Sequence, residues 1–129
     1  MKKHFIDLDN FTLNELRIIL NIAKDIKLNP SQFTERLKQK SLGMLFEKQS
    51  NRTRVSFDIG MKKLGGNIIE LNKASIGLGQ RESESDVLKV LSTYIDCLMI
   101  RNDDHNKMKN LVESNKIINE IENCIGNLY

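Results

Sequence analysis

The stretch SLGMLFEKQSNRTR, residues 41–54, decides the fold of this 129-residue chain. Its first half is a short apolar run without alternation, which predicts a strand buried on both faces. Its second half is a polar turn that leads into a helix, since the apolar residues Val55 and Ile59 stand four positions apart. The pair Gly65 and Gly66 is expected to end that helix, because glycine tolerates left-handed backbone geometry. This part of the chain therefore predicts a strand, a polar turn and a helix in succession.

The rest of the chain shows the same alternation of helix and strand signals. Thr12 and Glu15 form a capping box, in which each side chain accepts from the other's backbone N–H, and they begin the first helix. The apolar face of that helix is expected at Leu16, Ile19, Leu20, Ala23 and Ile26. The expected elements are helices at about 12–29, 51–64, 83–94 and 106–114, a short segment at 31–38, a loop at 73–82, and strands at 41–47, 67–71, 97–101 and 117–118.

This alternation predicts an α/β fold of three layers, with a parallel sheet of about four strands and helices on both faces. Residues 1–119 are expected to form one domain with one hydrophobic core, followed by a divergent tail at 120–129. Ligands of such sheets bind beyond the carboxyl ends of the strands. The turn at 50–54 and Arg101 both follow a predicted strand, so a binding site is expected there.

Composition argues against several classes of function. The chain is 40% apolar and 29% charged, as ordinary globular proteins are. Its formal charge of +3 is mild and only 5% of residues are aromatic, which argues against a nucleic-acid surface. No apolar stretch is long enough to span a bilayer, and the N-terminus does not resemble a signal peptide. We therefore expect a cytoplasmic protein with reduced thiols at Cys97 and Cys124, and no metal site at the isolated His4 and His105.

The turn at residues 50–54 has the chemistry of an anion site. The first N–H groups of a helix have no partner inside the helix, and the helix dipole places partial positive charge there. Ser50 and Thr53 would add hydroxyl donors, and Arg52 a planar guanidinium that matches phosphate oxygens. Arg101, at the end of another strand, could approach the same point.

A purely structural interpretation of the same turn stays open. Ser50 or Asn51 would then be a simple helix cap. The two arginines of the turn would form solvated ion pairs with nearby acidic residues, namely Arg52 and Arg54 with Glu47 or Asp58. A Ser-x-Arg-Thr turn by itself does not decide between the two interpretations.

Several motifs resemble those of the aspartate/ornithine carbamoyltransferase family. Residues 46–57, FEKQSNRTRVSF, resemble its carbamoyl-phosphate signature, which commonly reads FEKxSTRTRxSF. The resemblance covers roughly residues 7–119 and continues through residues 61–67. Residues 78–83 are similar to a mobile loop of the family, and residues 99–101 are similar to a strand end with a phosphate-binding arginine. Lys48, together with the motif at 99–101, favours the ornithine branch, because Pro usually follows Glu in the aspartate branch.

The resemblance implies a role for each matched residue. Ser50, Arg52 and Thr53 would bind the phosphate of carbamoyl phosphate, and Asn51 stands where the family usually has Thr. Arg101 would be the catalytic residue, since it would contact the phosphate and stabilise negative charge on the carbamoyl oxygen during attack. The implied reaction transfers the carbamoyl group to the δ-amine of ornithine, giving citrulline and phosphate. No metal or organic cofactor is implied.

The resemblance also implies a homo-oligomer, because the family forms trimers. Gly77 and Arg81 belong to the loop that crosses to the adjacent subunit in the family. The family usually has Gln or His at the position of Gly77, and Gly cannot supply the same contact. Arg81 could compensate in part through its charge.

Two further departures from the family bear on activity. Asn51 keeps a backbone N–H and an amide donor but lacks the Thr hydroxyl. After Ile117-Ile118 the family continues to a His-Pro-x-Gln segment and an ornithine domain, and neither occurs in residues 119–129. We therefore expect a truncated carbamoyl-phosphate-binding fragment that is inactive alone, because it has groups for only one reactant. The alternatives are a non-catalytic interaction module and the remnant of an interrupted gene.

Overall fold

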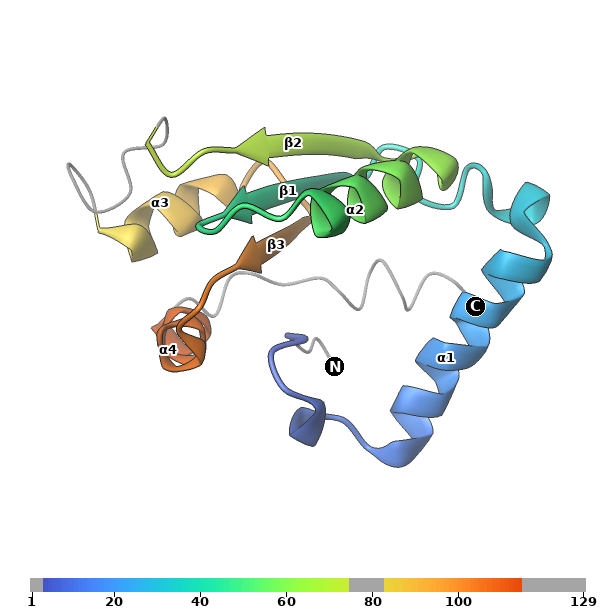
Figure 1. The fold of residues 1–129 in the computed structure, drawn as a ribbon, viewed down its shortest axis with the longest axis horizontal. Coiled ribbons are helices and arrows are strands. Elements are labelled where there is room, and N and C mark those ends of the chain that lie inside the picture. The colour runs from blue at the N-terminus through green and yellow to red at the C-terminus, as the bar shows by residue number, and fades with distance from the viewer. Residues whose placement is uncertain (1–3, 75–82, 115–129) are drawn as a thin grey trace.

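A computed structural model of the chain describes residues 4–74 and 83–114, and Figure 1 shows their arrangement. The elements are η1 (Leu8–Asn10), α1 (Leu13–Leu28), η2 (Pro30–Phe33), β1 (Ser41–Phe46), α2 (Asn51–Lys63), β2 (Asn67–Leu71), α3 (Glu84–Leu91), β3 (Cys97–Arg101) and α4 (His105–Ser114). The three strands expected up to Arg101 and the helices between them are confirmed. The fourth predicted strand at 117–118 and the tail at 120–129 lie outside the described residues. None of the described helices is long and apolar enough to cross a membrane.

The three strands form a parallel sheet in the order β2-β1-β3, with β1 in the centre. Leu45 of β1 lies opposite Leu71 of β2 and Ile100 of β3. The residues from Leu42 to Leu45 are all buried, which confirms that the apolar run forms a strand covered on both faces.

Helices α2 and α3 lie on opposite faces of this sheet. The chain passes from β1 to its neighbour β2 through α2, and then back across β1 to β3 through α3. Right-handed crossovers in opposite directions place the two helices on opposite faces. In Figure 1, α2 lies in front of β1, and the connection from α3 to β3 passes behind it. The direction in which successive strands are added to the sheet therefore reverses between β1 and β3. This reversal is the switch point of the sheet, and ligands of doubly wound sheets bind there.

A hydrophobic cluster attaches α3 to its face of the sheet. Buried Leu45 of β1 packs with buried Val87 of α3, and the partly buried side chains around them are Leu71, Leu91, Leu98 and Ile100. Gly43 lies on the same face of β1 as Leu45, because side chains alternate along a strand. A Cβ atom at Gly43 would come within 2.6 Å of Ile95 Cδ1, so the absent side chain lets this neighbour approach the sheet.

Helix α1 begins at the predicted capping box, and Thr12 and Glu15 make both reciprocal hydrogen bonds. Its buried side chain is Ile22, whereas Leu20 is 68% exposed. The prediction that Leu20 and Ala23 lie on the buried face is therefore wrong, because Ala23 is exposed as well. The buried face is centred on Ile19, Ile22 and Ile26, and Leu20, two positions from Ile22, lies on the other side of the helix.

The amino-terminal end of the sheet is closed by contacts within the protein. The Asp96 carboxylate, just before β3, accepts from Lys40 Nζ at 3.0 Å and from the Ser41 backbone N–H at 2.8 Å. Gly65, between α2 and β2, has a φ of 83°, the left-handed geometry that the sequence predicted. A Cβ atom at Gly65 would lie 2.5 Å from the backbone oxygen of Thr34.

Candidate functional site

The carboxyl ends of β1 and β3 bring two loops with polar side chains together. Phe46, the last residue of β1, lies opposite Arg101, the last residue of β3. The ladder continues one step further, because the Glu47 N–H donates to the Arg101 backbone oxygen at 3.0 Å. The exposed side chains of Lys48 and Asp103 also pair across the two loops at 3.2 Å. The turn before α2 and the end of β3 therefore lie side by side, as the strand-end argument predicted.

Three of the predicted site residues contact one another at this edge. Arg101 Nη1 donates to Ser50 Oγ at 3.0 Å and to Thr53 Oγ1 at 3.1 Å. The two hydroxyls are themselves joined, with Ser50 Oγ donating to Thr53 Oγ1 at 2.9 Å. Ser50 and Thr53 are partly buried, while Arg101 is exposed. The result is a cluster of one guanidinium and two hydroxyls at the switch point of the sheet.

Ser50 occupies the cap position of α2 but does not act as a side-chain cap. Its hydroxyl makes no capping hydrogen bond and contacts Thr53 and Arg101 instead. The first backbone bond of the helix runs from the Arg54 N–H to the Ser50 oxygen at 3.0 Å. The N–H groups of Asn51, Arg52 and Thr53 precede this bond, so they have no acceptor inside the helix. The interpretation of Ser50 as a simple side-chain cap is therefore wrong.

The two arginines of the turn have different surroundings. Arg54 Nη1 lies 4.0 Å from the Glu70 carboxylate of β2, so its charge is turned toward a neighbouring strand. The pairing of Arg54 with Glu47 or Asp58, left open by the sequence, is wrong. Arg54 pairs with Glu70 instead, while Asp58 pairs with Lys62 at 2.9 Å and Glu47 with Lys107 at 3.2 Å. Arg52 and Asn51 are exposed in the first turn of α2. Arg52, which precedes Thr53 in the chain, makes no ion pair within the described residues.

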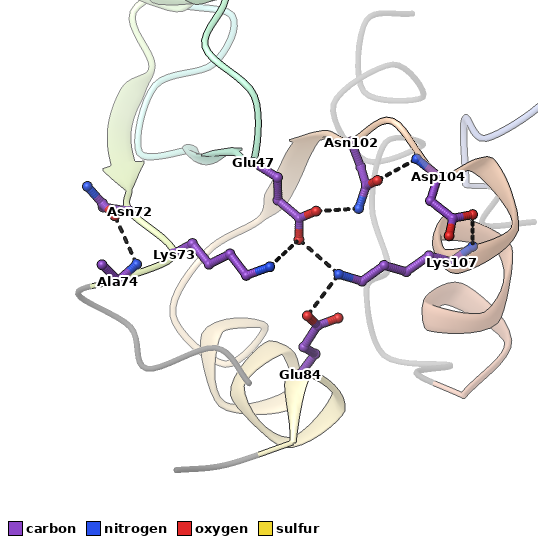
Figure 2. Close-up of polar contacts among 8 residues, drawn as sticks. All are labelled: Glu47, Asn72, Lys73, Ala74, Glu84, Asn102, Asp104 and Lys107. Atoms are coloured by element: carbon purple, nitrogen blue, oxygen red, sulfur yellow. Dashed lines mark hydrogen bonds and ion pairs between the residues drawn. The ribbon is translucent and has the colours of Figure 1, made fainter. Parts of the chain in front are cut away.

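A second group of polar side chains lies beside this cluster, centred on Glu47 (Figure 2). Glu47 Oε1 lies 3.2 Å from Lys107 Nζ of α4 and 3.9 Å from Lys73 Nζ, which follows β2. Its other oxygen, Oε2, accepts from the Asn102 side-chain amide. Lys107 Nζ also donates to Glu84 at the start of α3, at 2.8 Å. We call these five residues the Glu47 network.

The hydrogen bonds of the Glu47 network favour the charged form of Lys107. The bond to Glu84, followed by the bond and charge of Glu47, raises the pKa of the Lys107 ammonium, although partial burial opposes this shift. None of the network residues is among the site residues predicted from the sequence. Glu47 ends a predicted strand, and Lys73 and Asn102 each follow one closely, so the strand-end rule alone could have selected them.

The remaining predicted residues lie away from this edge or outside the described ranges. Gly77 and Arg81, predicted for a loop between subunits, lie outside the described residues. Asp7 Oδ2 lies 3.3 Å from His105 Nε2 and 3.4 Å from Lys109 Nζ, and these contacts, that of His105 first, lower the pKa of Asp7. Within residues 4–74 and 83–114, no three His, Cys, Asp or Glu side chains gather closely enough to hold a metal ion.

The fold and this edge define a doubly wound α/β domain with cationic and hydroxyl groups at its switch point. A sequence model described as "Aspartate/ornithine carbamoyltransferase, carbamoyl-P binding domain" matches residues 3–124. The chain therefore belongs to the aspartate/ornithine carbamoyltransferase family.

Individual relatives agree with this assignment. The ornithine carbamoyltransferase of Brucella ovis is 47% identical over 113 residues, which are 86% of this chain and 36% of that protein. The structure of ornithine carbamoyltransferase from Pyrococcus furiosus matches 89% of this chain and 37% of its own, with a TM-score of 0.80 and 34% identity. The catalytic subunit of M. jannaschii aspartate transcarbamoylase matches 89% of this chain and 39% of its own, with a TM-score of 0.75 and 30% identity. The chain spans 36% to 42% of the length of the curated relatives that it matches.

Proposed function

We propose that this chain binds carbamoyl phosphate through its phosphate group at the carboxyl ends of β1 and β3. The observation that carries the proposal is the contact of Arg101 Nη1 with both Ser50 Oγ and Thr53 Oγ1. These three groups come from the start of α2 and from the end of β3, and they converge at the switch point of the sheet. Their partners in the cluster are neutral hydroxyls, so the positive charge of Arg101 has no carboxylate next to it among the described residues.

An incoming phosphate group would complete this arrangement. Its oxygens would accept from the Arg101 guanidinium and from the hydroxyls of Ser50 and Thr53, which can turn their protons toward the anion. The N–H groups at the start of α2 and the helix dipole favour a negative charge at the same place. Arg52 would add a second guanidinium, and the Asn51 side-chain amide would donate where the family usually has a Thr hydroxyl.

Membership of the family supplies the reaction that we propose for these residues within a complete carbamoyltransferase. Lys48 after Phe46-Glu47, together with relatives named ornithine carbamoyltransferase, favours ornithine over aspartate as the acceptor of the carbamoyl group. In that reaction Arg101 would stabilise the negative charge that develops on the carbamoyl oxygen. The 129 residues taken alone are proposed to bind carbamoyl phosphate without turnover, because the identified groups hold only one of the two reactants.

Calorimetric titration with inorganic phosphate and with carbamoyl phosphate tests the proposal. We expect both ligands to bind the native chain, and Arg101→Ala to weaken binding about 100-fold, since it removes a charge and two hydrogen bonds. Arg54→Ala is the matched control, because Arg54 has the same charge in the same turn but faces Glu70. Absence of binding by the native chain, or equal losses in the two variants, would contradict the proposal.

A second proposal is that the chain associates with a copy of itself. Leu13, Leu20 and Leu28 are each exposed by about two-thirds, and their spacing along α1 places them on one helical face. Exposed leucines grouped on one helix face, here interleaved with Arg17 and Lys24, mark a candidate interaction site. Light scattering coupled to size-exclusion chromatography should show an oligomer that Leu20→Glu dissociates. A native chain that stays monomeric at all concentrations would refute this proposal.

A further inference from the structure

Two members of the Glu47 network, Glu47 and Asn102, join the turn before α2 to the end of β3, where the proposed phosphate-binding groups lie. We infer that Glu47 is a positioning residue, which holds the Arg101 guanidinium in register with Ser50 and Thr53 by tethering Asn102. This inference rests on the proposed phosphate site and assigns a function to a side chain that does not itself face that cluster. Figure 2 shows Glu47 between Lys73 on one side and Asn102 and Lys107 on the other.

Asn102 is the residue immediately after Arg101, and both ends of its side-chain amide are engaged. Its Nδ2 donates to Glu47 Oε2, and its Oδ1 accepts from the Asp104 N–H at 2.6 Å. Asp104 Oδ1 in turn accepts from the Lys107 N–H at 3.0 Å, at the start of α4. The chain that leaves β3 is therefore fixed directly behind Arg101 by a side chain that belongs to the β1 loop.

Glu47 makes this connection with both its backbone and its side chain. Its N–H donates to the Arg101 backbone oxygen at 3.0 Å, while its carboxylate binds Asn102 and Lys107. The carboxylate is only 16% exposed, so water competes weakly for these bonds. Ser50 follows Glu47 by three residues, so a shift of Glu47 would move the Ser50 hydroxyl relative to Arg101. One residue thus links the hydroxyl side and the guanidinium side of the site.

Charge and position predict opposite results when Glu47 is replaced. A carboxylate near an anion site repels the anion, so removal of its charge alone would strengthen phosphate binding. Loss of the tether would instead leave Arg101 less well aligned and weaken binding. If Glu47 positions Arg101, its replacement should weaken phosphate binding, whereas simple electrostatics predicts stronger binding.

The experiment is a double-mutant cycle with Glu47→Ala and Asn102→Ala, measured by phosphate calorimetry. Each variant is expected to weaken phosphate binding about tenfold, although only Glu47→Ala removes a charge. The double variant is expected to be no weaker than the single ones, because both changes break the same tether. Glu84→Ala is the matched control, since it also removes an acidic partner of Lys107 but touches neither β1 nor β3. The phosphate affinity of this variant should equal that of the native chain or exceed it.

A spectroscopic measurement separates positioning from general loss of structure. The Arg101 Nε–H resonance, assigned by its loss in Arg101→Lys, should shift in Glu47→Ala and Asn102→Ala but not in Glu84→Ala. Native-like affinity in Glu47→Ala, additive losses in the cycle, or an unmoved Arg101 resonance would overturn the inference. Failure of the native chain itself to bind phosphate would overturn the proposed function instead, so the two failures are distinguishable.

Discussion

The two ends of the parallel sheet place a cation next to polar groups in different ways. At the amino end, Lys40 Nζ meets the Asp96 carboxylate at 3.0 Å, and the second carboxylate oxygen accepts from the Ser41 N–H at 2.8 Å. At the carboxyl end, Arg101 meets the neutral hydroxyls of Ser50 and Thr53 at 3.0 and 3.1 Å. The first cation is neutralised within the fold, whereas the second is hydrogen-bonded but keeps its full charge.

This difference separates a contact that stabilises the fold from one suited to bind an anion. A phosphate group near Lys40 would have to displace Asp96, and the freed carboxylate would repel it. A phosphate group near Arg101 would displace no charged partner and would gain donors from both hydroxyls. The comparison therefore predicts that changes at the amino end alter stability and leave phosphate binding intact, while changes at the carboxyl end mainly alter phosphate binding and have only small effects on stability.

The largest loss of stability is expected from Gly65→Ala at the amino end. Gly65 has a φ of 83°, and an added Cβ would lie 2.5 Å from the Thr34 backbone oxygen, where no flexible side chain can yield. Left-handed strain and this clash together should lower the free energy of unfolding by about 3 kcal/mol. Urea denaturation measures the loss, and a native-like midpoint would show that the turn relaxes without cost.

The control for Gly65→Ala is Gly60→Ala in the middle of α2. A Cβ at Gly60 would meet no atom within 4 Å, so this substitution should be neutral or stabilising by up to about 1 kcal/mol. Phosphate affinity should be native-like in both variants once the folded fraction is taken into account. A large affinity loss in Gly65→Ala alone would mean that the two ends of the sheet are coupled.

A smaller loss of stability is expected from Asp96→Ala. This change leaves Lys40 and the Ser41 N–H without their carboxylate partner, both in partly buried positions. The expected loss is about 2 kcal/mol, less than for a fully buried ion pair because both side chains keep some contact with water. Thermal and urea unfolding report the loss, and Asp58→Ala, which breaks the more exposed pair with Lys62, is the comparison variant. Equal losses in the two variants would contradict a special role for the amino end.

The sequence was sufficient to predict features that depend on local chemistry. The apolar run of β1, the capping box at Thr12 and the left-handed Gly65 follow from residues close together in the chain, and all three are confirmed. The meeting of Ser50 with Arg101 was also predictable, because parallel strands bring their carboxyl ends to one edge.

Features that depend on register or on packing between elements could not be predicted. Glu47 contacts Asn102 because β1 and β3 pair Phe46 with Arg101, and no local signal determines that register. Lys107 reaches Glu47 only because α4 returns to the same edge. The burial of Ile22 rather than Leu20 depends on which side of α1 faces the rest of the protein. Helical periodicity limits the possible buried faces of α1 but does not determine which of them is buried.

The smallest effect concerns Lys107 at the carboxyl end, and it depends on pH. Its contacts with Glu84 and Glu47 raise the pKa of Lys107 above the ordinary value of 10.5, so the folded protein holds this proton more tightly than the unfolded chain. The resulting stabilisation is fully present below pH 10.5 and is lost as the pH rises through the raised pKa of the folded state. We expect the difference in unfolding free energy between the native chain and Lys107→Met to be constant from pH 8 to about 10 and to shrink above 10.5. It should amount to about 1 kcal/mol, because Lys107 remains partly exposed.

Denaturation series at several pH values measure this difference, and Lys62→Met is the control. Lys62 pairs with Asp58 in an exposed position on α2, so its contribution should be small at every pH. A difference for Lys107→Met that persisted unchanged well above pH 10.5 would show that packing of its aliphatic chain, and not its charge, stabilises the carboxyl end. The charged contacts of the Glu47 network would then matter for the position of Arg101 more than for the stability of the fold.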